Sequence, residues 1–83
     1  MQIRVKLFAT FRQYLPEQAG SEGILLEIGE NATPLQVLQR LGVPADAIHL
    51  VLINGEYIES QRREEAIFQD QDVLAVWPAV AGG

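Results

Sequence analysis

Residues 33–42 read Thr-Pro-Leu-Gln-Val-Leu-Gln-Arg-Leu-Gly and carry the best helix signal in the 83-residue chain. Thr33 can serve as the N-cap, Pro34 suits the first helical position, and Gln36 completes a Thr-x-x-Gln capping box. Gly42 suits the C-cap. The apolar stripe of this helix comprises Leu35, Leu38 and Leu41, together with Val37. We therefore expect one amphipathic helix, with Leu38 and Leu41 buried against a sheet.

Short strand patterns flank this helix on both sides. Ile3 to Phe8 alternates with period two, as a half-buried strand does, so that Ile3, Val5 and Leu7 share one face. Asn54-Gly55 is the strongest short-range hairpin signal. The expected strands cover 3–8, 24–28, 50–53, 56–59 and 73–77, the last ended by Pro78. The remaining elements are a short helix over 11–15 that stops at Pro16, and an irregular or single helical turn over 64–68.

The order of these elements is strand, strand, helix and then three strands. One amphipathic helix can cover one face of a mixed sheet, which makes this an α+β domain. If the first and last strands lie side by side at the centre, the arrangement is the β-grasp, a mixed sheet of about five strands covered by one main helix. The length allows one small domain. We assign residues 1–78 to this domain and residues 79–83 to a flexible C-terminal tail ending in Gly-Gly.

The composition excludes several kinds of site. Without cysteine the chain has no disulfide, thiolate metal site or cysteine nucleophile, which fits a reducing compartment. The formal net charge of −5 opposes binding to a phosphate backbone, so we expect no nucleic-acid partner. The acidity favours solubility and attraction to a basic protein surface. Since neither a transmembrane span nor a signal peptide is recognisable, we expect no membrane partner and a cytoplasmic location.

Residues for catalysis are nearly absent from the sequence. His49 is the only histidine, and without a cysteine or a second histidine it cannot anchor a zinc site or a triad, so we expect a surface or edge role. The acidic pairs Glu64-Glu65 and Asp70/Asp72 lie in polar turns, where a solvated face is the better interpretation. The glycines form no phosphate-binding pattern. We expect no bound cofactor or metal, and no catalysis by the domain alone.

The C-terminus, Ala79-Val80-Ala81-Gly82-Gly83, is the part that indicates chemistry. Pro78 sets the direction in which this tail leaves the sheet. Without Cβ atoms, Gly82 and Gly83 can enter a channel too narrow for any side chain. The terminal carboxylate is ionised and a poor electrophile, but adenylation would activate it, and an incoming sulfur could displace AMP to give a thiocarboxylate. An untethered end of small residues is the plain alternative.

The chain resembles the MoaD/ThiS family of ubiquitin-like sulfur carriers from end to end, and the MoaD branch more closely. The specific parts are the start Val5-Lys6-Leu7-Phe8-Ala9 with Phe11-Arg12, and the Pro-x-Val-x-Gly-Gly finish over 78–83. The helix over 35–41 and the Asn54-Gly55 turn also match. ThiS-type carriers are usually shorter and lack the Leu-Phe-Ala start.

Two positions depart from the MoaD pattern. The MoaD branch usually has a second proline where Ala79 stands, and this change would loosen the tail slightly. It usually has Asp-Gly-Asp where this chain has Asp70-Gln71-Asp72. Gln71 in place of that glycine predicts a turn without positive φ.

The resemblance implies a cycle with several partners. A ubiquitin-activating-type adenylating enzyme would use ATP and Mg²⁺ to adenylate Gly83, and a sulfur donor such as a cysteine desulfurase or rhodanese would supply the sulfur. The carrier would then pair with the large subunit of molybdopterin synthase, whose active site would receive Val80, Ala81 and Gly82. Its sulfur would form the dithiolene that holds molybdenum or tungsten. The alternatives are sulfur supply to thiamin thiazole or another pathway, a modifier joined to lysines, and an interaction module with an inert tail.

Strand alternation also predicts a partner interface. It sends every second residue of the first and last strands away from the helix, while Leu74 and Val76 point to the core. The residues expected on the outer face are Arg4, Lys6, Phe8, Val73, Ala75 and Trp77. Phe8 and Trp77 would form an apolar patch beside the tail, and aromatic anchors of this kind are typical hot spots. The predicted interface comprises Phe8, Ala75, Trp77 and Pro78.

Overall fold

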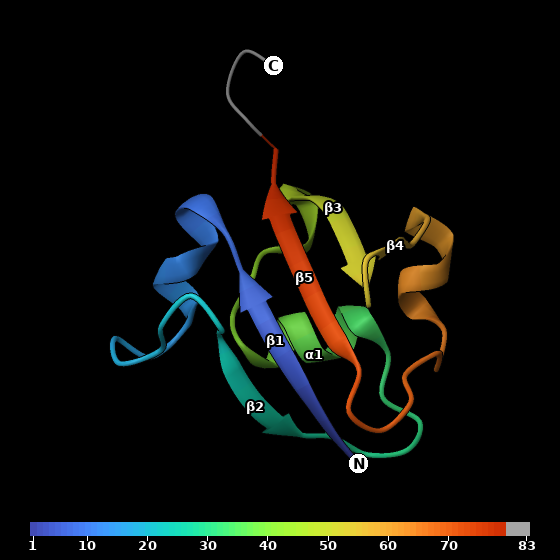
Figure 1. Ribbon diagram of the computed structural model, residues 1–83. Helices are drawn as coiled ribbons and strands as arrows, with labels where there is room; N and C mark the ends of the chain where they lie inside the picture. The colour runs from blue at the N-terminus through green and yellow to red at the C-terminus, as the bar shows by residue number, and fades with distance from the viewer. Residues whose placement is uncertain (80–83) are drawn as a thin grey trace.

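Five strands form one mixed sheet in the computed structural model, which describes residues 1–79. The strands are β1 (Gln2–Leu7), β2 (Ile24–Glu27), β3 (Ile48–Ile53), β4 (Glu56–Tyr57) and β5 (Val73–Pro78). Their order is β2-β1-β5-β3-β4, so the first and last strands lie side by side at the centre (Figure 1). β1 and β5 run parallel, and the other neighbouring pairs are antiparallel. This is the β-grasp arrangement that the sequence predicts.

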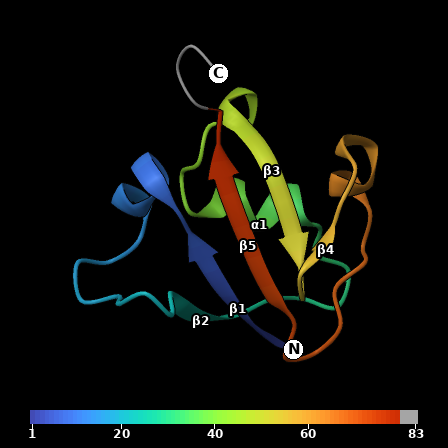
Figure 2. The same cartoon turned by 45° about the horizontal axis from the view of Figure 1, so that its top comes forward.

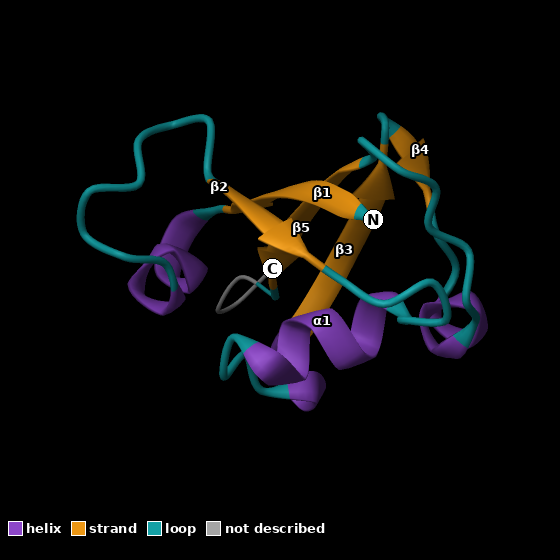
Figure 3. Ribbon diagram, turned by 90° about the horizontal axis from the view of Figure 1, so that it is seen from below, coloured by secondary structure: helices purple, strands orange, loops and turns teal. Residues whose placement is uncertain are grey.

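The α-helix within residues 1–79, α1 (Pro34–Arg40), crosses one face of the sheet and leaves the opposite face uncovered (Figures 2 and 3). The predicted capping box fixes its start. The Thr33 hydroxyl oxygen accepts from the Gln36 backbone N–H at 3.1 Å, and the Gln36 side-chain oxygen accepts from the Thr33 N–H at 3.1 Å. Gly42, at φ 89°, follows the last turn in the left-handed conformation that commonly ends a helix.

The core lies between α1 and the inner face of the sheet. Leu38 is fully buried and Val37 is 2% exposed, whereas Leu41 is only partly buried at the edge of the core. Leu35, predicted in the apolar stripe, is half-buried and lies outside the core cluster, because the buried face of α1 runs through Pro34, Val37 and Leu38. The other core side chains are Ile3, Val5, Leu7, Phe11, Ile28, Val43, Val51, Ile53, Ile58, Phe68, Leu74 and Val76.

The Asn54-Gly55 turn joins β3 to a β4 of only two residues, and both turn residues have positive φ (52° and 83°), as in a type I′ turn. The Asn54 side-chain nitrogen donates to one carboxylate oxygen of Asp72 at 2.8 Å. The Gln69 backbone N–H donates to the other oxygen at 2.8 Å. Asp72 is therefore buried and hydrogen-bonded, with 7% of its surface exposed, and its assignment to a solvated face is wrong.

Short 3-10 helices occupy several connections in the described part of the chain. η1 (Ala9–Tyr14) takes the place of the helix expected over 11–15. η3 (Ser60–Glu64) precedes most of the segment 64–68, which is irregular after residue 64. η2 (Ala45–Ala47), just before β3, has no counterpart among the predicted elements.

The conformation of the turn that leads into β5 contradicts a second prediction. Gln71 adopts φ 72°, so the expectation of a turn without positive φ is wrong. In this turn the Gln71 N–H donates to the Gln2 carbonyl at 2.6 Å, while the Asp72 N–H donates to the Gln69 carbonyl at 3.1 Å. The chain must turn at residue 71 and must also keep its hydrogen bond to the start of β1. The left-handed conformation of Gln71 allows both.

Candidate functional site

The uncovered face of the sheet is the candidate interface. Lys6 and Ala75 are register partners on β1 and β5, and both side chains point to this face. On the other side of β5, Leu52 pairs with Ala75 and Leu50 pairs with Trp77. The predicted faces are confirmed by the burial of the alternate residues Val5, Leu7, Leu74 and Val76.

Phe8 and Trp77 stack at one end of this face. Their ring centroids are 4.3 Å apart and their planes differ by 5°. The Phe8 N–H donates to the Val76 carbonyl at 3.1 Å, which extends the β1–β5 pairing by one residue, and Ala9 at φ 53° then turns the chain into η1. Both aromatic residues remain half-buried. The predicted aromatic patch therefore exists on the outer face, beside the end of β5.

The chain leaves the sheet next to η2. Pro78 is the last residue of β5 and pairs with Ile48. The Ala79 N–H then donates to the Ala47 carbonyl at 3.1 Å. A proline at position 79 has no N–H and cannot make this bond, so the alanine that departs from the MoaD pattern gains a contact of its own. This hydrogen bond offsets the loosening expected from the missing proline.

The predicted reacting end lies beyond these contacts. Gly83, together with Val80, Ala81 and Gly82, falls outside the described residues 1–79. The structure fixes the point from which this segment departs, which is the end of the central strand β5 (Figure 1). The Phe8–Trp77 stack lies at the same end of the sheet.

Titratable side chains form no metal-binding group of three or more within residues 1–79. His49 is exposed, as predicted for a surface role, and Glu64-Glu65 is exposed as well. The Gln2 backbone N–H donates to the Asp70 carboxylate at 2.7 Å and lowers the pKa of Asp70, at the end of the sheet opposite the exit of β5. No helix in this part of the chain is long and apolar enough to cross a membrane.

Sequence reasoning missed two features of the site. Leu50 and Leu52 lie on the outer face, but 50–53 is a continuous apolar run that carries no period-two signal to assign its faces. Their position follows from the β3–β5 register. The contact between Ala79 and Ala47 joins distant parts of the chain through backbone atoms alone, so no side-chain pattern announces it.

Together, the parallel central strands, the open face with its aromatic pair and the extension beyond β5 define a ubiquitin-like β-grasp protein. The chain belongs to the ThiS family, whose sequence model matches residues 5–83. This is a MoaD/ThiS-type family of sulfur carriers and ubiquitin-like modifiers, and membership implies partnership with an adenylating enzyme and a large synthase subunit.

Solved structures match almost the whole chain. The Haloferax volcanii HVO 2177 protein has a TM-score of 0.75 and 26% identity, covering 100% of this chain and 87% of that one. SAMP1, small archaeal modifier protein 1 from the same organism, has a TM-score of 0.66 and 28% identity, with 100% of both chains covered. A Pyrococcus furiosus protein assigned as subunit 1 of molybdopterin converting factor has a TM-score of 0.64 and 25% identity, covering 96% and 99%. The comparison with curated proteins gives no significant match.

Proposed function

We propose that the protein is a sulfur carrier in which the C-terminal carboxylate of Gly83 is adenylated and then converted to a thiocarboxylate. The observation that carries this proposal is the position of residue 79, which is hydrogen-bonded at the end of the central strand β5 and is followed in the sequence by a segment that ends in Gly82-Gly83. Sulfur donation in molybdopterin biosynthesis is the favoured pathway. The Leu7-Phe8-Ala9 start and the similarity to the Pyrococcus furiosus protein support it.

The proposed conversion of the Gly83 carboxylate to a thiocarboxylate has three steps. A carboxylate oxygen of Gly83 attacks the α-phosphorus of ATP, and pyrophosphate leaves while Mg²⁺ offsets its charge. The terminal sulfur of a partner's cysteine persulfide attacks the acyl carbon, and AMP leaves. A second partner thiolate then attacks the donor cysteine's sulfur, which forms a cystine disulfide and releases the thiocarboxylate. In this scheme ATP, Mg²⁺ and the thiols belong to the adenylating enzyme and to the sulfur donor, such as a cysteine desulfurase or rhodanese.

The domain's own contribution is binding and orientation. The Phe8–Trp77 stack, with Ala75 and Pro78 next to Trp77 on β5, is the proposed contact surface for the adenylating enzyme and for the large subunit of molybdopterin synthase. Half-buried aromatic residues supply large apolar area with few rotatable bonds. Their place beside the chain exit means that docking at this surface would also direct the tail.

A protein modifier is the second candidate, and the similarity to small archaeal modifier protein 1 favours it equally. In that case a target lysine amine attacks the same activated carbon of Gly83, AMP leaves, and an isopeptide bond forms. Because Lys6 is the only lysine in the chain, copies of the protein would be joined to one another only through Lys6. Sulfur supply to thiamin thiazole remains the alternative destination for a carrier.

Three changes at the C-terminus test the proposal. Deleting Gly83 moves the carboxylate by up to about 3.6 Å, and a misplacement of about 1 Å can cost about 100-fold in rate. Adding a residue after Gly83 displaces the carboxylate as well. Gly82→Val keeps the length but adds a branched side chain to a residue meant for a narrow channel. We expect all three variants to lose activity and to keep a melting temperature near that of the parent, since they lie beyond β5.

The assay combines the protein with a cognate adenylating enzyme, ATP, Mg²⁺ and a sulfur donor, followed by intact mass spectrometry for the exchange of one oxygen for sulfur. Gln18→Ala, a change at an exposed loop residue, is the matched control and should acquire sulfur like the parent. If the truncated or extended protein acquires sulfur as readily as the parent, the carrier proposal fails and an inert interaction module replaces it.

Lys-Gly-Gly remnants on target proteins would instead establish the modifier. Sulfur transfer to purified molybdopterin synthase would assign the pathway.

A further inference from the structure

Most basic side chains of this protein are held by contacts within the chain. The contacts are Arg4 to the Glu22 carbonyl (3.1 Å), Arg40 to the Glu27 carbonyl (2.7 Å), Arg63 to the His49 carbonyl (2.9 Å) and Arg62 to the Glu65 carboxylate (3.6 Å). Of the six lysine and arginine residues, this leaves Lys6 and Arg12. Neither side chain has a hydrogen bond or ion pair within residues 1–79, so both charges are available to a partner.

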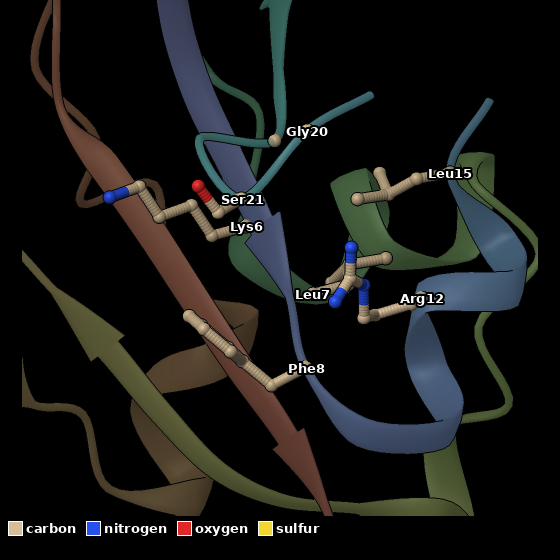
Figure 4. Close-up of a pocket in the computed structure, with 8 residues that line it drawn as sticks. Lys6, Leu7, Phe8, Arg12, Leu15, Gly20 and Ser21 are labelled. Carbon is tan, nitrogen blue, oxygen red and sulfur yellow. The ribbon is translucent and has the colours of Figure 1, made fainter. Parts of the chain in front are cut away.

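Lys6 and Arg12 line the same pocket, a cavity of about 60 Å³ between β1, η1 and the loop 20–23. In Figure 4 the Lys6 side chain lies over β5 on the same side as the Phe8 ring, while Arg12 reaches back from η1 toward Leu7. The two cations therefore flank the end of β1, where Phe8 begins the aromatic stack. The remaining lining residues are Leu7, Phe8, Leu15, Gly20, Ser21 and Gly23.

From this arrangement we infer that the partner surface covering the Phe8–Trp77 stack is acidic beside Phe8, with carboxylates that pair with Lys6 and Arg12. The inference rests on the proposed function, because it concerns the protein that activates or receives the C-terminus. A guanidinium binds a carboxylate bidentately, which adds direction to the charge attraction. Ion pairs at the edge of an apolar contact fix its register and speed association.

The negative net charge of the chain does not conflict with an acidic partner surface, because screening limits the effect of charges to short distances. A total charge of −5 predicts attraction to a basic surface, whereas the pocket predicts an acidic one. Charges separated by more than about 8–10 Å are largely screened at physiological ionic strength. The total charge thus sets solubility and long-range repulsion, while Lys6 and Arg12 determine which groups make direct contact next to Phe8.

The occupant of the pocket is a protein side chain rather than a nucleotide. A cavity of about 60 Å³ is large enough for a few waters or for one small functional group. A carboxylate group fits such a space and a nucleotide does not. Leu7, Phe8 and Leu15 supply apolar walls for the methylene stem of an aspartate or glutamate, and Arg12 supplies the charge for its head. Lys6, whose side chain lies over β5, would pair with a second carboxylate beside the pocket.

Charge reversal tests the inference separately from the proposed function. Lys6→Glu and Arg12→Glu are compared with Arg62→Glu, which changes the net charge equally on the exposed η3. The double variant changes the net charge by twice as much and serves as the strongest perturbation of the pocket. Binding of the cognate adenylating enzyme is measured by calorimetric titration at low and at high ionic strength. We expect each reversal at position 6 or 12 to weaken binding about tenfold or more and to reduce its salt dependence. Arg62→Glu should stay within about twofold of the parent.

The possible results distinguish the inference about an acidic partner surface from the proposed function as a sulfur carrier. If the double reversal binds as well as Arg62→Glu, the inference is overturned, and sulfur acquisition by the parent shows whether the proposed function still stands. If the parent acquires no sulfur, the proposed function fails, and the binding comparison still decides the inference because it requires affinity alone. Inorganic phosphate is titrated as a separate probe. Saturable phosphate binding that the reversals abolish, with unchanged enzyme binding, would reassign the pocket to a small anion and overturn the inference.

Discussion

Gln71 is held in a conformation that its side chain opposes. Its φ of 72° lies in the left-handed region, which costs a residue with a Cβ about 1–2 kcal/mol. The Gln71 side chain offers only an exposed contact of 3.5 Å to the Asp70 carboxylate, which is long for a hydrogen bond. Glycine would avoid the steric cost but would lose about 0.5–1 kcal/mol through the greater freedom of the unfolded chain.

We therefore expect Gln71→Gly to raise the free energy of unfolding by about 0.5–1 kcal/mol. Urea denaturation of the parent and the variant measures this difference. Gln69→Gly is the matched control, because Gln69 is also exposed but does not have positive φ, and this change should lower stability. A loss of stability in Gln71→Gly would mean that the Asp70 contact outweighs the backbone strain.

At the scale of single residues, the sequence predicts what depends on local period and misses what depends on distant partners. Trp77 was correctly assigned to the outer face because strand alternation carries that information within a few residues. The burial of Asp72 depends on Asn54, which approaches it only after β3 and β5 have paired. An aspartate in a polar turn has no sequence feature that distinguishes these two environments.

At the scale of elements, α1 stabilises the fold through a narrow buried face. Leu38 is fully buried against the sheet. We expect Leu38→Ala to lower the free energy of unfolding by about 2–5 kcal/mol, because it removes apolar contacts and leaves a cavity. That is a large fraction of the stability of so small a domain.

Thermal and urea denaturation measure the effect of Leu38→Ala. Gln39→Ala is the control on the exposed side of the same helix and should change stability by less than about 0.5 kcal/mol. Equal stabilities for the two variants would show that the buried face of α1 is assigned wrongly.

Element boundaries were predictable where the signals are local. The capping box, Pro34 and Gly42 fix α1 from the sequence, and Asn54-Gly55 fixes the hairpin. The boundaries of the 3-10 helices were not predictable, because such short segments depend on the strands that anchor their ends. η2 is an example, because the Ala47 carbonyl at its end bonds to the Ala79 N–H beyond the last strand.

At the scale of the whole molecule, the two faces of the sheet have different roles. The inner face stabilises the fold, and the outer face carries the candidate interface. The inner side chains of β1 and β5 are fully buried against α1, whereas the outer ones remain half-buried and include the Phe8–Trp77 stack. The parallel central pair places the end of β5 beside Phe8, so the chain leaves the domain at the candidate interface. The order of elements, which was predictable, therefore also positions the site.

Leu74 and Trp77, three residues apart on β5, test this division directly. Trp77→Ala should weaken binding of the adenylating enzyme by about 2 kcal/mol or more, which is about 30-fold in Kd, because it removes an aromatic anchor. Its effect on stability should be smaller than that of a core truncation, because Trp77 is only half-buried on the outer face. Phe8→Ala removes the other ring and should behave in the same way.

Leu74→Ala should show the opposite behaviour. Leu74 is fully buried on the inner face, so its truncation should lower the free energy of unfolding by about 2–5 kcal/mol. The affinity of the folded protein should remain unchanged, because the outer face is intact. Calorimetric titration with the enzyme and urea denaturation measure the two quantities on the same samples. A large fall in stability with unchanged affinity for Trp77→Ala would mean that the functions of the two faces are reversed.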